Sequence, residues 1–544
     1  MKKWTKLVKN LNSSDKKQRK EARASLVGIC CAVFLVIVAI VSLIIAKIPP
    51  RAGVKDSELP EGVKTLTGTA AGRNGDITVT VVTDGEKIYQ IKVGDHKETE
   101  NIGTEAVKQL PAKIFKAQSL KVDVISGATI SSNGIKAAII NALEEGGVNP
   151  MIFDGSVVLA DTVAEKVETH SGAQITLAKD WSEQYPYIYA SWKSTEENSA
   201  AEDYLEIYPM LKTLYAPYGF SKDYKGARGH AFTLEDVVET KRTGENSKAS
   251  CWTCKTPQFT NMVNEQGVEV YGGSFMELAG VLTEPISCYT CHANNPGVIT
   301  VTHTYLTDGV GEDFEAIDAA TLSCGQCHNE YFFDPGNGGA TTLPHDSLAS
   351  MHPDAILAFY NDGANFPSGE AFYDYISDDT GVPQLKVQHP ELETFLGEGS
   401  PHRGTYTCAD CHMGMVEAED GTVYRDHSLR SPLDNPALIE SECAKCHEDL
   451  DAEVRATQAQ VEARTYSIGY ELEFLHERLA RAIEDNELSD EQLEELRSLS
   501  RDAQFYWDFV FVENAEGVHN PALTAYCLDQ AEALCNQALG MFQR

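Results

Sequence analysis

The first strong hydrophobic pattern in the chain is an uncharged run over residues 25–46. About 20 apolar residues cross a bilayer as a helix, so this run predicts a single transmembrane anchor. Residues 1–24 carry nine Lys or Arg and two Asp or Glu, a net charge of +7. Basic flanks stay in the cytoplasm, so we expect a single-pass protein of the cell membrane whose remaining residues lie outside the cytoplasm. A cleaved signal peptide is the alternative, but its apolar region usually has only about 7–15 residues.

Beyond a Pro- and Gly-containing linker at 47–63, the pattern changes to strand and then helix. Residues 76–93 alternate apolar and polar side chains around Asp84-Gly85, which predicts a β-hairpin. Residues 126–147 have apolar positions near the helical period, with Gly146 as a stop signal. These elements predict a small α+β domain over residues 64–146, followed by a connector at 147–180.

The remaining chain divides into a loop-rich part and a helical part. Residues 181–450 show little periodicity and are dense in Cys and His, so something other than apolar side chains must fill their core. Residues 451–544 have helical spacing, and the sequence ELSDEQ at 487–492 predicts a capped break between two long helices. The predicted fold class is therefore multidomain: a transmembrane helix, a small α+β domain, and a mainly helical, loop-rich domain ending in long helices.

Charge excludes one class of partner. The chain has 45 Lys or Arg against 81 Asp or Glu, a net charge of −36, and residues after 24 carry −43. Such a chain repels the phosphate backbone, so we expect no nucleic-acid partner.

Ten of the fourteen cysteines form five Cys-x-x-Cys pairs. Disulfides or zinc knuckles would leave the next residue variable, whereas four pairs are followed by His. Two thiols at this spacing bond the vinyl groups of a c-type haem, and the following side chain ligates its iron. The pattern therefore predicts five haem c groups. Their attachment residues are Cys251 and Cys254, Cys288 and Cys291, Cys324 and Cys327, Cys408 and Cys411, and Cys443 and Cys446, and the adjacent iron ligands are Lys255, His292, His328, His412 and His447.

The first pair differs from the others because Lys255 follows it. Lysine ligates iron only as the neutral amine, so its pKa would have to fall far below the usual ~10.4. An unusual axial ligand is useful to a haem whose opposite face stays open for a substrate. The alternative is a degenerate motif that has lost its haem.

One Cys-x-x-Cys-Lys followed by four Cys-x-x-Cys-His resembles the ammonia-forming cytochrome c nitrite reductases, from about residue 181 to the C-terminus. Segments 214–232 (LYAPYGFSKDYKGARGHAF), 324–333 (CGQCHNEYFF), 385–394 (LKVQHPELET) and 508–521 (DFVFVENAEGVHNP) extend the resemblance. It implies that Lys255 is the proximal ligand of a catalytic haem, with Arg242, Tyr331 and His389 in the pocket on the other side. It also implies distal iron ligands for the second to fifth haems, in the order His427, His230, His519 and His402.

The same resemblance implies a calcium site and a dimer. The calcium ligands would be Glu330, the carbonyls of Tyr331 and Lys386, and the side chain of Gln388, an all-oxygen set suited to that ion. The C-terminal helices would form a homodimer interface.

The N-terminal domain has a separate resemblance. The sequence DVISGAT at 123–129 resembles the flavin-attachment motif of the FMN-binding domain in sodium-pumping quinone reductases, with FMN esterified to Thr129. A helix-capping loop without flavin is the alternative.

Together these resemblances imply a six-electron reduction of nitrite to ammonium. A membrane-associated donor, a quinol or an upstream reductase, would supply electrons through FMN. The alternatives on the same scaffold are a reductase of another small oxyanion or nitrogen oxide, such as sulfite or hydroxylamine, and a non-catalytic electron conduit.

Overall fold

The structure is a computed structural model that describes residues 52–542 apart from 56–58, 61, 86, 101, 121, 123, 126–127, 147, 149 and 154–162. The chain divides between residues 155 and 156 into two compact units. The predicted anchor at 25–46 lies outside the described residues. Among the residues that are described, no helix is long and apolar enough to cross a membrane.

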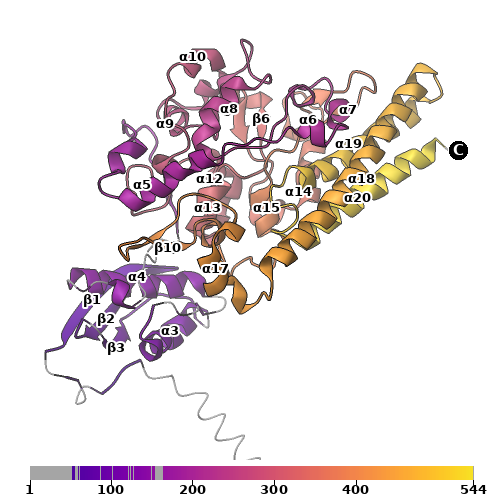
Figure 1. Ribbon diagram of the computed structural model, residues 1–544. Helices are drawn as coiled ribbons and strands as arrows, with labels where there is room; N and C mark the ends of the chain where they lie inside the picture. Colours follow the sequence, from indigo (N-terminus) through magenta and orange to yellow (C-terminus); the bar gives the residue numbers. More distant parts are fainter. Residues whose placement is uncertain are drawn as a thin grey trace, which may run out of the picture. The chain divides into compact units, whose positions relative to one another are not determined.

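The N-terminal unit is built on a three-stranded antiparallel sheet (Figure 1). Its strands are β1 (Lys64–Gly72), β2 (Gly75–Thr83) and β3 (Ile88–Val93), in the order β1-β2-β3. The predicted hairpin is confirmed: β2 and β3 pair antiparallel, and Gly85 in the turn has the left-handed φ of 102° that glycine accommodates. Alternate residues Ile77, Val79 and Val81 are fully buried, so one face of β2 forms the core.

Two helices complete this unit. Helix α4 (Thr129–Glu145) packs on β1 and β2, and it ends directly before Gly146, as predicted. The packing is close at Gly68, where a Cβ would lie 2.2 Å from the backbone nitrogen of Ala142. Helix α3 (Gly103–Ala117) was not predicted from the sequence, because it contains Pro111, which disfavours a helix interior.

The C-terminal unit begins with many short elements, as its weak periodicity indicated. Its described residues form four two-stranded sheets: β4 (Glu165–Lys166) with β5 (Thr300–Val301), β6 (Phe332–Asp334) with β7 (Ala340–Thr342), β8 (Tyr375–Ile376) with β9 (Pro383–Gln384), and β10 (Met415–Glu417) with β11 (Val423–Arg425). Its short α-helices are α5 (Pro186–Lys193), α6 (Tyr204–Ile207), α7 (Leu211–Leu214), α8 (Thr233–Glu239), α9 (Pro257–Gln266), α10 (Phe275–Ala279), α11 (Cys288–His292), α12 (Thr304–Val310), α13 (Ala319–Gly325), α14 (Pro353–Asn361), α15 (Glu391–Leu396), α16 (Cys408–His412) and α17 (Pro436–Ser441).

Three long helices end the chain and lie side by side in Figure 1: α18 (Leu450–Glu484), α19 (Asp490–Phe511) and α20 (Pro521–Met541). The predicted break is confirmed, because the Ser489 hydroxyl caps α19 and the Gln492 side chain caps the Ser489 backbone in return. Buried residues of these helices, among them Leu475 and Trp507, pack with Met210 and Leu211 in one large core. This core fixes the loop between α19 and α20, which carries His519.

Candidate functional site

Two of the five Cys-x-x-Cys motifs form single turns of α-helix. The second and fourth motifs are helices α11 and α16, and each follows a capping box, made by Ser287 and Thr407 respectively. One helical turn brings positions three and four apart to the same side, so both thiols and the histidine face one region. All ten motif cysteines are free thiols in this structure. In the second and fourth motifs the two thiols and the histidine are therefore grouped as haem attachment requires.

Each of the four motif histidines has a second histidine ring close to it. A metal ion lies about 2 Å from a ligating imidazole nitrogen, so two rings that share one ion have centres roughly 6–6.5 Å apart. The observed ring-centre distances are 6.5 Å for His292 and His427, 6.3 Å for His328 and His230, 6.2 Å for His412 and His519, and 6.2 Å for His447 and His402. The structure thus brings together all four ligand pairs that the family resemblance implied, at a spacing that fits an iron between them.

His328 also lies near a third histidine. Its ring centre is 6.2 Å from that of His389 and 6.3 Å from that of His230. Ring spacing therefore gives His328 two neighbours, and the resemblance assigns His230 as its partner and His389 to the catalytic pocket.

Several of these histidines are oriented through their Nδ1 atoms. An Nδ1–H that donates to an acceptor leaves Nε2 for the metal, which is the usual arrangement of ligating histidines. Nδ1 lies 2.7–3.0 Å from an oxygen in five of them: His292 with the Val298 carbonyl, His412 with the Arg430 carbonyl, His427 with the Arg425 carbonyl, His447 with Glu453, and His519 with Glu513. This tautomer supports the interpretation that the Nε2 atoms of these histidines bind haem iron.

Thiols of different motifs lie close together. The Cys254 sulfur of the first motif lies within 4.8 Å of the Cys327 sulfur of the third, and the Cys408 thiol of the fourth lies near enough to Cys324 of the third to lower its pKa. The first, third and fourth haem positions are consequently direct neighbours, with the third in the middle.

The motif ending in Lys255 has a different backbone from the others. Residues Ala249–Trp252 form a 3-10 turn, and Cys254 has a left-handed φ of 59°. Trp252 is buried and stacks on Phe275 with ring centres 4.4 Å apart. The Thr233 hydroxyl donates to the Lys255 carbonyl at 2.8 Å. These contacts fix the turn from which the lysine side chain leaves.

The predicted pocket residues surround this motif. Lys255 lies close enough to His389 to act on its pKa, and burial lowers the pKa of His389 to about 4. Its Nδ1 has no hydrogen-bond partner among the described residues. Tyr331 packs in the same cluster as Cys254, and burial together with the neighbouring thiols raises its pKa well above the usual range. Arg242 is exposed and lies near Cys251. The structure thus gathers Lys255, His389, Tyr331 and Arg242 around one haem position.

Three residues of the implied calcium site, Glu330, Lys386 and Gln388, are joined by hydrogen bonds. Burial raises the pKa of Glu330 well above its usual range, although its carboxylate accepts hydrogen bonds from the Tyr360 hydroxyl (2.8 Å) and the Gln388 backbone (2.6 Å). The Gln388 side-chain amide donates to the Lys386 carbonyl at 2.8 Å. A buried carboxylate beside carbonyl and amide oxygens fits a hard cation such as Ca²⁺.

Sequence reasoning missed Asp374 at this site. Its carboxylate accepts the Lys386 backbone N–H at 2.8 Å, and burial raises its pKa to about 6. The Lys386 ammonium does not neutralise these groups fully, because it pairs with Asp508 at 3.3 Å. Asp374 lies in a loop with no local signal, so only the fold shows its place.

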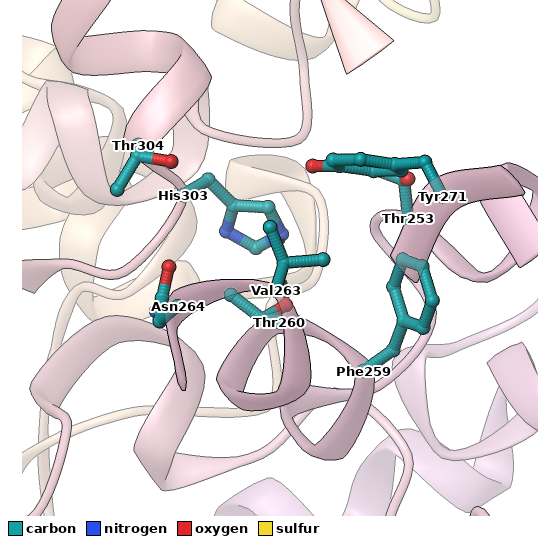
Figure 2. Close-up of a pocket in the computed structure, with 8 residues that line it drawn as sticks. All are labelled: Thr253, Phe259, Thr260, Val263, Asn264, Tyr271, His303 and Thr304. Atoms are coloured by element: carbon teal, nitrogen blue, oxygen red, sulfur yellow. Dashed lines mark hydrogen bonds between the residues drawn. The ribbon is translucent and has the colours of Figure 1, made fainter. Parts of the chain in front are cut away.

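A second group missed from the sequence surrounds His303, in the small polar pocket of Figure 2. The His303 ring contacts the Gln326 side chain at 3.0 Å and the Thr260 hydroxyl at 3.2 Å. The Gln326 amide donates to the Thr290 carbonyl at 2.8 Å. Since Gln326 and Thr290 lie inside the third and second motifs, this network ties two haem-attachment turns together.

Thr129 is the first residue of α4 and is partly exposed. A helix N-terminus favours a phosphate group, and an exposed hydroxyl can carry a phosphoester. The position therefore fits the predicted flavin linkage.

Comparison with known proteins supports both resemblances. The cytochrome c552 family matches residues 178–543, and the FMN-binding domain family matches residues 72–144. Among solved structures, the cytochrome c nitrite reductase of Desulfovibrio desulfuricans, described with two calcium sites, is 27% identical with a TM-score of 0.60. The match covers 67% of this chain and 85% of that one.

Two other cytochromes match more weakly. The outer cell wall cytochrome OcwA is 18% identical over 56% of this chain and 48% of that one, with a TM-score of 0.30. The undecahaem S-layer cytochrome of Carboxydothermus ferrireducens is 16% identical over 58% and 41%, with a TM-score of 0.29. On the match that spans most of its C-terminal unit, the chain belongs to the cytochrome c552 family.

Proposed function

We propose that this protein reduces nitrite to ammonium at the haem bound through Cys251, Cys254 and Lys255. The observation that carries the proposal is an asymmetry among the five motifs. Each motif that ends in His meets a second histidine at a spacing suited to one iron, whereas the motif ending in Lys255 is surrounded by Arg242, Tyr331 and His389. Four positions are arranged for electron transfer, and one is arranged for a substrate.

The pocket residues suit the reaction. Nitrite is an anion, and its conversion to ammonium takes up six electrons and eight protons and releases two water molecules. The haem, when bound, supplies the iron that holds the substrate nitrogen and delivers electrons to it. Arg242 offers a fixed positive charge to the nitrite oxygens. His389, kept neutral by burial, and Tyr331 hold hydrogen bonds to those oxygens and pass protons to them.

Electrons would enter through the N-terminal unit. FMN on Thr129 would accept them from a membrane-associated donor, a quinol or an upstream reductase, and four bis-His haems would carry them to the Lys255 haem. This arrangement agrees with an anchor at residues 25–46 that leaves both units outside the cytoplasm.

Calcium would stabilise the loop that carries His389. Glu330, Gln388 and the carbonyls of Tyr331 and Lys386 hold the ion in this proposal, and Gln388 directly precedes His389. The calcium site therefore fixes the backbone of two pocket residues, Tyr331 and His389, at once.

A homodimer would form through α18. Tyr466, Tyr470 and Phe474 lie four residues apart on one face of this helix and are 39%, 40% and 57% exposed. An exposed aromatic stripe of this kind favours burial against a second copy.

The test is a dye-linked assay on the purified full-length protein. Reduced viologen should be oxidised only when nitrite is added, with one ammonium formed for every six electrons. Oxidation of the dye by other acceptors without ammonium formation would instead identify an electron conduit. A higher kcat/KM for sulfite or hydroxylamine than for nitrite would identify a different main substrate.

A further inference from the structure

The side chain of Arg242 is held by an aromatic ring. Its guanidinium carbon lies 4.2 Å from the ring centre of Phe220, on the ring face. Gly219, the residue before Phe220, lets the aliphatic part of the Arg242 side chain approach, because a Cβ there would lie only 3.1 Å from Arg242 Cγ. An arginine stacked on an aromatic face keeps its planar end in one orientation.

Two hydrogen bonds in series hold the same guanidinium at its Nε atom. Arg242 Nε donates to the Thr240 hydroxyl oxygen at 3.1 Å, and that hydroxyl donates to Asp223 at 2.8 Å. The Asp223 carboxylate also accepts the Lys241 backbone N–H at 2.8 Å. Within the part of the chain that the structure describes, the two terminal nitrogens of Arg242 form no hydrogen bond. The fork of the guanidinium is therefore available for a ligand.

Phe220 also contacts the segment that carries His389. The Lys386 ammonium, which is buried and paired with Asp508, lies 5.1 Å from the Phe220 ring centre. Lys386 precedes His389 by three residues. The Phe220 ring thus contacts both Arg242 and the segment that carries His389.

We propose that Phe220 and Thr240 are positioning residues that select an anionic substrate with two oxygen atoms. They hold Arg242 so that both terminal NH2 groups point to the substrate, and a guanidinium fork binds two oxygens of one anion in parallel. Nitrite presents two oxygens to this fork, whereas hydroxylamine is uncharged near neutral pH and presents one. The inference rests on the proposed function and adds the groups that set its preference for nitrite.

The experiment compares three variants in the full-length holoprotein: Phe220→Leu, Thr240→Val and the conservative Phe220→Tyr. Phe542→Leu is the matched control, because Arg478 stacks on Phe542 at 4.5 Å in the C-terminal helices. Each protein is assayed with nitrite and with hydroxylamine. Nitrite affinity is also measured by titrating the haem absorption of the oxidised protein, which needs no turnover.

We expect Phe220→Leu to raise both the KM and the Kd for nitrite about fivefold, the upper range of a cation–π contact at an exposed arginine. The kcat for nitrite and the KM for hydroxylamine should change by less than about twofold. Thr240→Val should show the same pattern, Phe220→Tyr should restore the affinity, and Phe542→Leu should have no effect. In an Arg242→Lys background, Phe220→Leu should raise the Kd for nitrite by less than a further factor of about two, because Phe220 affects the substrate only by positioning the arginine.

Two results would overturn the inference: unchanged nitrite affinity in Phe220→Leu and Thr240→Val, or an equal loss with both substrates. If Phe220→Leu binds fewer haems than the unmodified protein, Thr240→Val decides the question alone. If nitrite binds but no ammonium forms, the proposed function fails, and the affinity series still decides the role of Phe220.

Discussion

The ring of His519, in the loop between α19 and α20, faces the ring of His412 in the fourth Cys-x-x-Cys motif at 6.2 Å. Glu513 orients His519 by accepting its Nδ1 proton at 2.7 Å. The long C-terminal helices thereby reach the haem-attachment motifs, because the loop between two of them places a histidine ring at ligand spacing from His412.

This relationship predicts the effect of His519→Ala. The variant should retain all five haems, because the thioether bonds to Cys408 and Cys411 remain. One haem should change from low-spin to high-spin, since its iron loses a strong-field ligand. Electron paramagnetic resonance of the oxidised protein measures the change, and His476→Ala, on α18 and in none of the histidine pairs, serves as the control. A spin-state ratio equal to that of the unmodified protein would remove His519 from the ligand set.

Haem content tests the motif with lysine. We expect five c-type haems per chain from the pyridine haemochrome spectrum against protein concentration. A value of four would mean that the turn around Cys251 and Cys254 holds no haem, and the proposed active site would then be lost.

The lysine ligand itself can be exchanged. Lys255→His should keep the haem attached but lower nitrite turnover at least about tenfold, a loss of about 1.4 kcal/mol in transition-state stabilisation. The expected cause is a changed axial ligand beneath the substrate position, and the measurement is kcat with a reduced dye. Turnover equal to that of the unmodified protein would show that lysine has no catalytic purpose.

Removal of calcium should destabilise the C-terminal unit. A ligand present at 100 times its Kd stabilises the folded state by about 2.7 kcal/mol, so a chelator should lower the Tm by several degrees. Glu330→Gln should remove this response, because the neutral amide neither needs nor attracts the ion. Calorimetry with and without chelator measures both. An identical chelator effect in Glu330→Gln would place the ion elsewhere.

The flavin prediction concerns the N-terminal unit alone. Denatured protein should retain an FMN mass on the peptide that contains Thr129, and Thr129→Ala should lose this mass while keeping all five haems. The variant should still reduce nitrite with a dye that reaches the haems directly, and it should fail in membranes given only the natural reductant. Membrane-driven activity without flavin would show that electrons enter the haems from another protein.

Local sequence patterns were sufficient to predict many of the helices, strands and turns of this molecule. The hairpin around Gly85, the end of α4 before Gly146 and the cap at Ser489 depend on residues within a few positions of one another, and each was predicted. The haem-attachment turns are equally local. Helix α3 was missed because burial of Pro111 in the core outweighs its poor helix propensity.

Long-range partners were not visible in the pattern. Nine histidines lie outside the motifs beyond residue 181, and composition does not separate the iron partners from the rest. His303, for instance, bonds to Gln326, and His345 pairs with Glu393 in the core. Only the resemblance selected His230, His402, His427 and His519. Phe220 and Asp374 had no signal of either kind, because their roles depend on contacts with Arg242 and Lys386 that the fold creates.

The contact between thiols of neighbouring motifs constrains how the protein matures. The Cys254 thiol lies near that of Cys327, and the Cys324 thiol near that of Cys408. A chain that folded without haem outside the cytoplasm, where we propose that this protein lies, would therefore hold thiol pairs open to oxidation. Disulfides across two motifs would then block both attachment sites. We therefore expect haem attachment to precede closure of the C-terminal unit during biogenesis. Peptide mapping of protein secreted without haem supply should find the Cys254–Cys327 and Cys324–Cys408 bridges, and free thiols at all four positions would contradict this order.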